Sequence, residues 1–471
     1  MLAQASPIGH LSKVAPIQLW RIAALTNDTQ KNALVTSAGD AIRKTSPADN
    51  RLIQRMVTDA SASVVDMEQS ARPVLRRVGR WEFHEEDYQQ LVIWAEHLSG
   101  DLERLVEHFN DSFQEHSKKG HLQHTELPSW VVAGRIIYAD LSEQEREILD
   151  LSCVPELQVL NCRNNRLFLL DFSRTPLLSH MWVDGNQLTE LDLSHTPRLT
   201  KLWCGINLRK LYRTRGEKNL SIGENHFTSL DLSHSPNLTE LSCVGNRLTH
   251  LDLSHTPRLK KLWCDRNQLT DLDLSSTHAL TVLSCSKNQL AELDLTHTPD
   301  LVELRCNSNR LTDLDLSATP YLKELWCTNN QLSKLDLFYT PNLTQLGCGG
   351  NKMTEVDLSH TPHLTTLSCA ESQLSDLSLS HTPALEKLFC DGNRLTQLDL
   401  SHTPRLSQLF VAGNQLTELN LSHTPELWWL SCFKNQLTEL DLRPCKGLRL
   451  ISVDPAVEVS SLPSQNVNRV S

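Results

Sequence analysis

Residues 238–258 read LTELSCVGNRLTHLDLSHTPR, and near-copies of these 21 residues follow one another along most of the chain. From about Leu157 to Leu442 the shared pattern is L-x-x-L-x-C-x-x-N-x-L-x-x-L-D-L-S-H-T-P-x. A fixed period of this length is the signature of stacked structural repeats. The chain is therefore expected to form a solenoid in which each repeat contacts only its neighbours.

The asparagine of the pattern sets the register of the repeats. It predicts fourteen copies, with one shortened step from Asn207 to Asn225 and with Ser372 in one asparagine slot. Each amide is expected to satisfy backbone groups of its own and the neighbouring coil, as a buried ladder. The copy around Ser372 should be looser, because a hydroxyl replaces only part of an amide. The asparagines are Asn165, Asn186, Asn207, Asn225, Asn246, Asn267, Asn288, Asn309, Asn330, Asn351, Asn393, Asn414 and Asn435.

One half of each copy alternates like a β-strand. Within residues 259–264, Leu262 and Cys264 are expected to point into the core and Trp263 away from it. Such strands, stacked about 4.8 Å apart, form a parallel sheet over one continuous core. The return half, residues 269–274, again alternates, which predicts a second extended segment and, with similar spacing on both faces, weak curvature.

The repeat resembles the short bacterial leucine-rich repeat in its cysteine-bearing form, sometimes called IRREKO. The resemblance covers residues 157–442, and the departures are Val183 and Val411 in cysteine slots and the irregular copy near residues 207–225. It implies an α+β, mainly β protein: a leucine-rich-repeat parallel solenoid of about 14 coils. The usual role of such solenoids is protein–protein interaction, and the resemblance identifies no ligand.

The two ends of the chain lack the repeat. Residues 1–45 are expected to be poorly ordered, 46–147 to form a small α-helical capping domain, 148–445 the solenoid, and 446–471 a C-terminal cap and tail. The clearest helical periodicity runs from Asp87 to Phe109, with apolar residues at alternating steps of four and three. It fits a helix packed within the cap, or a short dimerising coiled coil. Residues 116–126 are expected to be a linker.

Charge and hydropathy exclude several classes of protein. A net charge of -11 and a pI near 6.0 argue against binding to nucleic acid or to an anionic membrane. No apolar run is long enough to cross a bilayer as a helix, so no transmembrane helix is expected. The N-terminus lacks a basic region followed by an apolar one, which argues against a cleavable signal peptide. A cytoplasmic location is expected, with secretion into a host cell without such a peptide as the alternative.

Eleven of the thirteen cysteines stand three residues before the asparagine slot. There is no C-x-x-C pair, which disfavours a metal site, and parallel neighbouring side chains disfavour disulfides. A column of small buried hydrophobic groups in a reducing compartment fits the pattern. The eleven are Cys162, Cys204, Cys243, Cys264, Cys285, Cys306, Cys327, Cys348, Cys369, Cys390 and Cys432.

Histidines and aspartates form two further columns, represented by His255 and Asp252. Stacked histidines near 5 Å apart could share a cation, and a carboxylate column could hold calcium. One carboxylate per coil offers too few ligands, so turn capping by aspartate and neutral, solvated imidazoles are favoured. We expect no metal and no cofactor.

The position between leucine and cysteine points outward from the sheet, and neighbouring outward positions add Trp429. Solvent-facing Trp and Phe reduce solubility unless something covers them, and Trp and Arg are enriched at interaction hot spots. Strands also favour aromatic residues for structural reasons alone, which stays open as the alternative. The expected partner-binding residues are Trp182, Trp203, Trp263, Arg305, Trp326, Phe389, Phe410 and Trp429.

These features favour a non-enzymatic interaction protein with protein partners and no small-molecule substrate. The part of the chain before the solenoid contains no nucleophile–base arrangement, metal spacing or phosphate loop, so no catalytic residue is expected. The alternative is a secreted, type III-like bacterial effector that acts in a host cell, with any activity in the N-terminal helical domain. The basic stretch 209–218 is either a docking loop for an acidic partner or a solvated bulge.

Overall fold

The structure is a computed structural model, which describes residues 75–95, 100–118, 129–206 and 225–462 and the backbone of 467–469. The chain divides into two compact units, residues 1–74 and 75–471, and all described residues belong to the second. The predicted disordered segment 1–45, Leu98 of the predicted helix and the basic stretch 209–218 lie outside the described residues.

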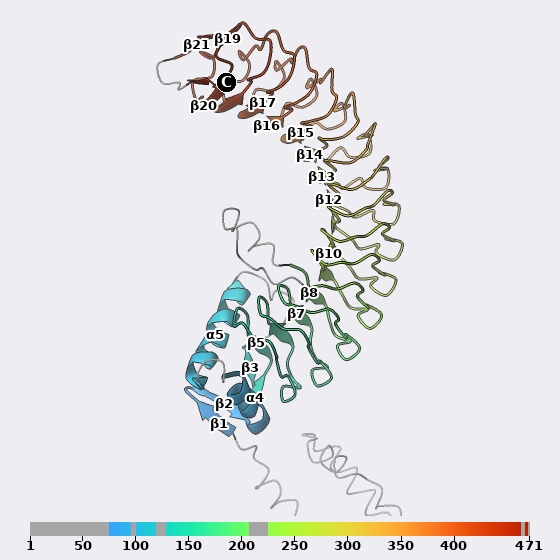
Figure 1. Ribbon diagram of the computed structural model, residues 1–471, viewed down its shortest axis with the longest axis vertical. Helices are drawn as coiled ribbons and strands as arrows, with labels where there is room; N and C mark the ends of the chain where they lie inside the picture. Colours follow the sequence, from blue (N-terminus) through green and yellow to red (C-terminus); the bar gives the residue numbers. More distant parts are fainter. Residues whose placement is uncertain (1–74, 96–99, 119–128, 207–224, 463–466, 470–471) are drawn as a thin grey trace, which may run out of the picture. The chain divides into compact units, whose positions relative to one another are not determined.

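Sixteen short strands form one sheet in which consecutive coils are neighbours (Figure 1). The pairs are parallel and in register, as where Lys261 lies beside Val282. The predicted parallel solenoid is thus confirmed. The strands are β5 (Tyr138–Asp140), β6 (Val159–Asn161), β7 (His180–Trp182), β8 (Lys201–Trp203), β9 (Glu240–Ser242), β10 (Lys261–Trp263), β11 (Val282–Ser284), β12 (Glu303–Arg305), β13 (Glu324–Trp326), β14 (Gln345–Gly347), β15 (Thr366–Ser368), β16 (Lys387–Phe389), β17 (Gln408–Phe410), β18 (Trp429–Ser431), β20 (Leu450–Val453) and β22 (Val467–Arg469).

The side chains of each strand alternate between core and surface as predicted. In β10, Leu262 and the following Cys264 are fully buried, whereas Trp263 on the opposite face is half-buried. The leucines and cysteines of successive coils form one hydrophobic core along the stack. Burial raises the pKa of the Cys243 thiol to about 12, so the cysteine column behaves as apolar filling.

The return side of the coils differs from the prediction of a second extended segment in each copy. Among the described residues, only β19 (Glu439–Asp441) and β21 (Glu458–Ser460) pair as strands there. In the other coils this side is built from turns. Asp252 Oδ1 accepts the Ser254 N–H at 2.9 Å, and Ser254 Oγ hydrogen-bonds His255 Nδ1 at 2.8 Å. These contacts confirm the turn-capping interpretation of the aspartate column.

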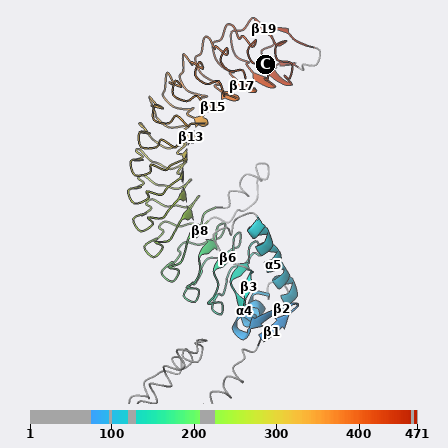
Figure 2. The ribbon, with the colours of Figure 1, turned by 180° about the vertical axis from the view of Figure 1, so that it is seen from behind.

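The prediction of weak curvature assumed that neighbouring coils are equally spaced on their strand side and their return side. Turns replace strands on the return side of most described coils, so this assumption does not hold. Figures 1 and 2 show the strands on the inner side of a curved stack of coils. Strand hydrogen bonds hold neighbouring coils about 4.8 Å apart on that side, and among the described residues only β19 and β21 form such a ladder on the other side.

The asparagine column joins each coil to the one before it. Asn267 Nδ2 donates to the carbonyl oxygens of Cys264 in its own coil and Cys243 in the preceding coil, both at 3.0 Å. Its Oδ1 accepts the N–H of Leu248 at 3.1 Å. The predicted buried ladder is confirmed, and it satisfies backbone groups that the turn would otherwise leave unpaired.

The separate irregular copy predicted at residues 207–225 is wrong. Asn225 Nδ2 donates to Cys204 and Val183, and its Oδ1 accepts the Leu188 N–H, which are the ladder bonds of the coil that contains β8. Strand β8 then pairs directly with β9. Residues 207–224 are therefore an insertion within one coil, and its length, slightly below one period, imitated a shortened repeat.

The N-terminal end of this unit is a cap of mixed structure. A hairpin of β1 (Leu75–Val78) and β2 (Trp81–His84) precedes α4 (Glu85–Ala95) and α5 (Leu102–Lys118), and β3 (Val131–Val132) pairs with β4 (Arg135–Ile136). The prediction of a purely helical cap missed these strands. The sheet also extends beyond the predicted solenoid bounds of 148–445, because β5 precedes them and β20 and β22 follow.

The single helix predicted from Asp87 to Phe109 is wrong. Gly100 has a φ of +78°, which interrupts a right-handed helix, and Asp101 Oδ1 caps α5 by accepting the Arg104 N–H at 2.9 Å. Leu91, Leu105 and Phe109 are nevertheless fully buried in one core. The apolar face thus packs within the cap, and α5 extends into the segment predicted as a linker.

The Ser372 slot offers a direct test of the asparagine ladder. Its hydroxyl is buried without a hydrogen-bond partner among the described residues. Ser372→Asn should stabilise the stack by about 1 kcal/mol, because the amide regains the ladder bonds within its own coil and to the preceding coil. Urea unfolding measures the shift. Ser372→Ala is the matched control and should change little, whereas a destabilising Ser372→Asn would contradict this account.

The cysteine column predicts a graded thiol reactivity. All thirteen cysteines are free, and Cys153 alone is half-exposed while the others are buried. With a thiol-specific chromogenic disulfide at pH 8, one cysteine should react rapidly in the folded protein and thirteen after denaturation, because buried thiols with raised pKa hold almost no thiolate. Rapid reaction of several thiols in the folded state would contradict a packed column.

Candidate functional site

The first and third residues of each of the strands β5 to β18 point away from the core of the coils and form what we call the sheet face. Its N-terminal end, over β5 to β7, is covered by α5. Ser112 Oγ lies 2.8 Å from the Tyr138 hydroxyl, and the Phe113 and Tyr138 rings pack edge-on at 5.4 Å. The His116 ring lies 5.9 Å from that of Trp182. Trp182, predicted to bind a partner, is therefore buried at 4% exposure, and the prediction that it faces solvent is wrong.

A polar network accompanies this cover. Ser112 donates to the Asp140 carboxylate, and Arg163 is paired with the Asp184 carboxylate. Burial raises the pKa of Asp184, and the neighbouring Arg163 guanidinium opposes that shift. The paired charges are satisfied within the protein, so this end of the sheet face is a structural contact with the cap.

Immediately beyond the cover, Trp203 and Trp263 form a half-buried pair. Their ring centroids are 5.9 Å apart although β9 lies between their strands. The rings can meet because β9 carries Ser242, which is only 7% exposed, at the position between them. The Arg163 guanidinium lies 4.9 Å from the Trp203 ring centroid, a cation–π contact that continues the column from Trp182.

Charged side chains occupy the neighbouring column and the middle of the face. Lys201 and Lys261 lie 3.7 Å and 3.4 Å from Glu240 Oε1. Farther along, Arg305 pairs with Glu303 at 2.7 Å and with Glu324 at 3.4 Å. The predicted residue Arg305 is exposed, as expected, but its charge is already neutralised by carboxylates within the sheet face.

Trp326 lies flat against the next coil. A Cβ atom at Gly347 would come within 2.3 Å of Trp326 Cε3, so the ring occupies the space that a side chain there would need. The glycine lets one face of the indole pack on the sheet while the side chain stays half-buried.

A second aromatic group lies on β16 to β18, toward the C-terminal end of the sheet. Phe389 and Phe410 stack at 5.0 Å, and Trp429 meets Phe410 edge-on at 4.7 Å. Trp428, which the sequence analysis did not include, lies 5.6 Å from Trp429 and is half-buried. It directly precedes β18, and the Trp-Trp pair in the sequence was the signal that could have identified it.

The sheet face thus gathers the predicted residues into distinct groups. Trp203 pairs with Trp263, Trp326 packs alone on Gly347, and a C-terminal group is formed around Phe410. Among the described residues, no three His, Cys, Asp or Glu side chains are placed to hold a metal ion. In the same part of the chain, no helix is long and apolar enough to cross a membrane.

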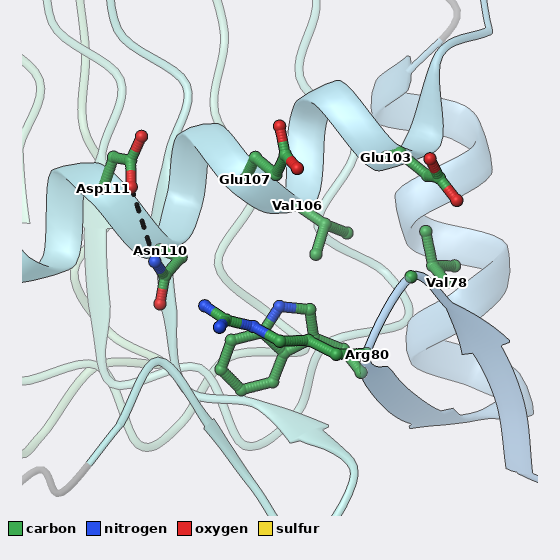
Figure 3. A pocket seen from close by; sticks show the side chains of 9 residues that line it. Val78, Arg80, Glu103, Val106, Glu107, Asn110 and Asp111 are labelled. Carbon is green, nitrogen blue, oxygen red and sulfur yellow. Dashed lines mark hydrogen bonds between the residues drawn. The ribbon is translucent and has the colours of Figure 1, made fainter.

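A separate groove of about 500 Å³ lies on the cap, between α5 and the turn of the β1–β2 hairpin (Figure 3). Glu103, Glu107 and Asp111 line its helical side. The Arg80 guanidinium lies 5.1 Å from the Trp81 ring centroid at the opposite side. The groove holds no nucleophile–base pair, and it is not part of the sheet face.

A parallel stack of coils with leucine and cysteine columns inside and an asparagine ladder at the turn defines a leucine-rich-repeat solenoid. The functional domain of InlJ from Listeria monocytogenes, whose structure includes a cysteine ladder, is 32% identical to this chain over 68% of each chain, with a TM-score of 0.61. The chain therefore belongs to the bacterial leucine-rich-repeat proteins with short cysteine-bearing repeats.

Two further solved structures share the fold. The leucine-rich-repeat protein LIC12759 from Leptospira interrogans is 21% identical, with 74% of this chain and 98% of that chain covered and a TM-score of 0.61. YopM from Yersinia enterocolitica is 24% identical, with 71% and 80% covered and a TM-score of 0.55. No family model and no curated protein sequence matches the chain.

The contact between Trp326 and Gly347 can be tested by a double-mutant cycle. Gly347→Ala should destabilise the protein by about 1–3 kcal/mol, because the added methyl group displaces a packed indole. In a Trp326→Ala background the same substitution should cost much less. Urea unfolding of the four proteins gives the coupling energy. Equal costs in both backgrounds would show that the indole does not rest on Gly347.

Proposed function

We propose that this protein is a non-enzymatic binding protein that holds protein partners on its sheet face. The observation that carries the proposal is the row of half-buried aromatic side chains beyond the reach of α5, from Trp203 to Trp429. Tryptophan is enriched at the hot spots that supply most of the binding energy of protein interfaces, and aromatic residues in general are enriched in such interfaces. Their cost in solubility is offset when a partner covers them.

The kinship with bacterial leucine-rich-repeat proteins supports a role in protein interaction. Electrostatics supports the same class of partner, since a net charge of -11 disfavours polyanionic nucleic acid. Aromatic groups at two separate parts of the face suit an extended protein surface better than a compact small molecule, which would need a concave pocket.

A second candidate is an exported effector that acts inside a host cell. The leucine-rich effector protein YopM from Yersinia pestis supports it by fold alone, at 21% identity over 80% of this chain and a TM-score of 0.56. The buried thiol column supports folding in a reducing compartment, which is cytoplasmic in either the producing or the receiving cell. Fusion to a translocation reporter separates the two locations.

Affinity capture with two matched double variants tests the binding face. Trp263→Ala/Trp326→Ala removes aromatic side chains from the sheet face, and Phe338→Ala/Tyr339→Ala removes exposed aromatic side chains from the turn on the return side of the coil that contains Trp326. Specific partners of the wild type, identified by quantitative mass spectrometry, should fall at least about tenfold with the first variant, as expected for hot spots. They should be retained by the second.

Partner sets that are identical for the wild type and the sheet-face variant would refute the proposal. Circular dichroism and thermal unfolding establish that both double variants remain folded. Because each variant loses two aromatic side chains, a general loss of hydrophobic surface would reduce capture by both of them equally.

A further inference from the structure

The burial of the sheet face changes abruptly along the stack. Every residue of β5, β6 and β7 is buried, including the outward ones, whereas the outward residues of β10 are half-buried on both sides of its central leucine. The boundary falls at β8, where Lys201 is buried and Trp203 is not. The Trp203–Trp263 pair is thus the first part of the face beyond the cap.

The element that covers the buried part is an amphipathic helix that crosses the strands. Ser112 and Phe113 of α5 contact Tyr138 on β5, and His116, one turn farther, contacts both the Tyr138 hydroxyl, at 3.1 Å, and the Trp182 ring on β7. The contacts therefore advance along the stack as the helix advances (Figure 1). The buried residues of α5 recur at helical spacing: Leu105, Val106, Phe109, Ser112 and Phe113.

A helix in this direction matches the repeat of the sheet. One helical turn rises about 5.4 Å, and neighbouring strands are about 4.8 Å apart. Side chains at i, i+3 or i+4, and i+7 therefore meet successive strands nearly in step. A helix needs about two turns to cross β8, β9 and β10, and its apolar side chains would lie on the rings of Trp203 and Trp263, which meet above the buried Ser242.

We propose that the occupant of the Trp203–Trp263 pair is an amphipathic α-helix of a partner protein, laid across β8 to β10 in continuation of the surface that α5 already covers. This identification rests on the proposed function and specifies the kind of partner segment. The aromatic column is continuous across the boundary, because the Arg163 guanidinium lies against both Trp182, at 5.4 Å, and Trp203, at 4.9 Å.

The charged column beside the rings defines the flank of the partner helix. Lys201, Glu240 and Lys261 alternate in sign, and the Lys261 side chain is 42% exposed whereas that of Lys201 is 8% exposed. The accessible charge is thus positive and lies next to Trp263. A complementary helix has apolar residues along one stripe and a carboxylate at the edge of that stripe, facing Lys261.

An extended partner strand fits this face less well. Strands bind sheets by pairing with backbone groups at an open edge, and the backbone groups of β8 to β10 are already paired with a strand on each side. The side chains of the face remain as the contact surface, and a helix supplies side chains without needing backbone partners.

Selection from two displayed peptide libraries tests the proposal with the full-length protein. The first library has a helix-forming host of about five turns, with apolar residues varied at i, i+3, i+4 and i+7. The second has the same composition with a central proline, which breaks the helix. Helical peptides should be enriched, and their dissociation constants, from fluorescence anisotropy, should rise at least about tenfold for Trp203→Ala and for Trp263→Ala.

Phe389→Ala/Phe410→Ala is the matched control, since it removes an aromatic pair from the same face, and it should change affinity less than about twofold. Trp203→Phe keeps a ring in place should Trp203→Ala fail to fold, and it should retain most of the binding. Lys261→Glu should weaken peptides that carry the flanking carboxylate.

Enrichment of the proline-containing library, or helical binders that respond only to Phe389→Ala/Phe410→Ala, would overturn the proposal. Absence of selectable binders would overturn it as well. A different result would refute the proposed function: unchanged capture of natural partners by Trp263→Ala/Trp326→Ala. A third result would separate the two proposals. If natural partners require those tryptophans but only extended peptides are selected, the binding function is retained and the helical occupant is refuted.

Discussion

The structure depends on one constraint: the turn of each coil has backbone groups that only the adjacent coil can satisfy. The asparagine amide meets this need by bonding two carbonyls and one N–H across two coils, as Asn267 does with Cys264, Cys243 and Leu248. A shift of one coil by a single residue would unpair all three groups and expose the leucine face. The ladder therefore fixes the register in which every other column forms.

The fixed register determines which outward residues of adjacent coils are neighbours, but it does not restrict their residue types. A large side chain in one coil can use the space above a small one in the next, as Trp326 does over Gly347 and the Trp203–Trp263 pair does over Ser242. Because a large side chain lies beside a small one in the adjacent coil, each ring packs with one face on the sheet. In the proposed binding function, side chains that are already packed on one face lose less conformational freedom when a partner covers them.

The sequence predicted the features that repeat and missed those that occur once. Period and alternation placed the strands, the cysteine core and the asparagine ladder, because each of these follows from local spacing. The burial of Trp182 could not be predicted, since it depends on α5, which is distant in the sequence. The role of Asn225 was misread because the insertion before it is nearly as long as one repeat. The hydrogen bonds of Asn225 and the direct pairing of β8 with β9 distinguish the two.

The contrast between Trp182 and Trp203 shows what determines the role of a residue in this solenoid. Both are tryptophans in the same column, they lie side by side in register, and both lie against Arg163. One is core because α5 lies over it, and the other is surface because the cover ends at β7. The repeat thus places equivalent residues at equivalent positions, and the cap, which is not part of the repeat, makes their burial differ. The part of the face that the cap leaves uncovered is then defined by where the protein's own helix stops.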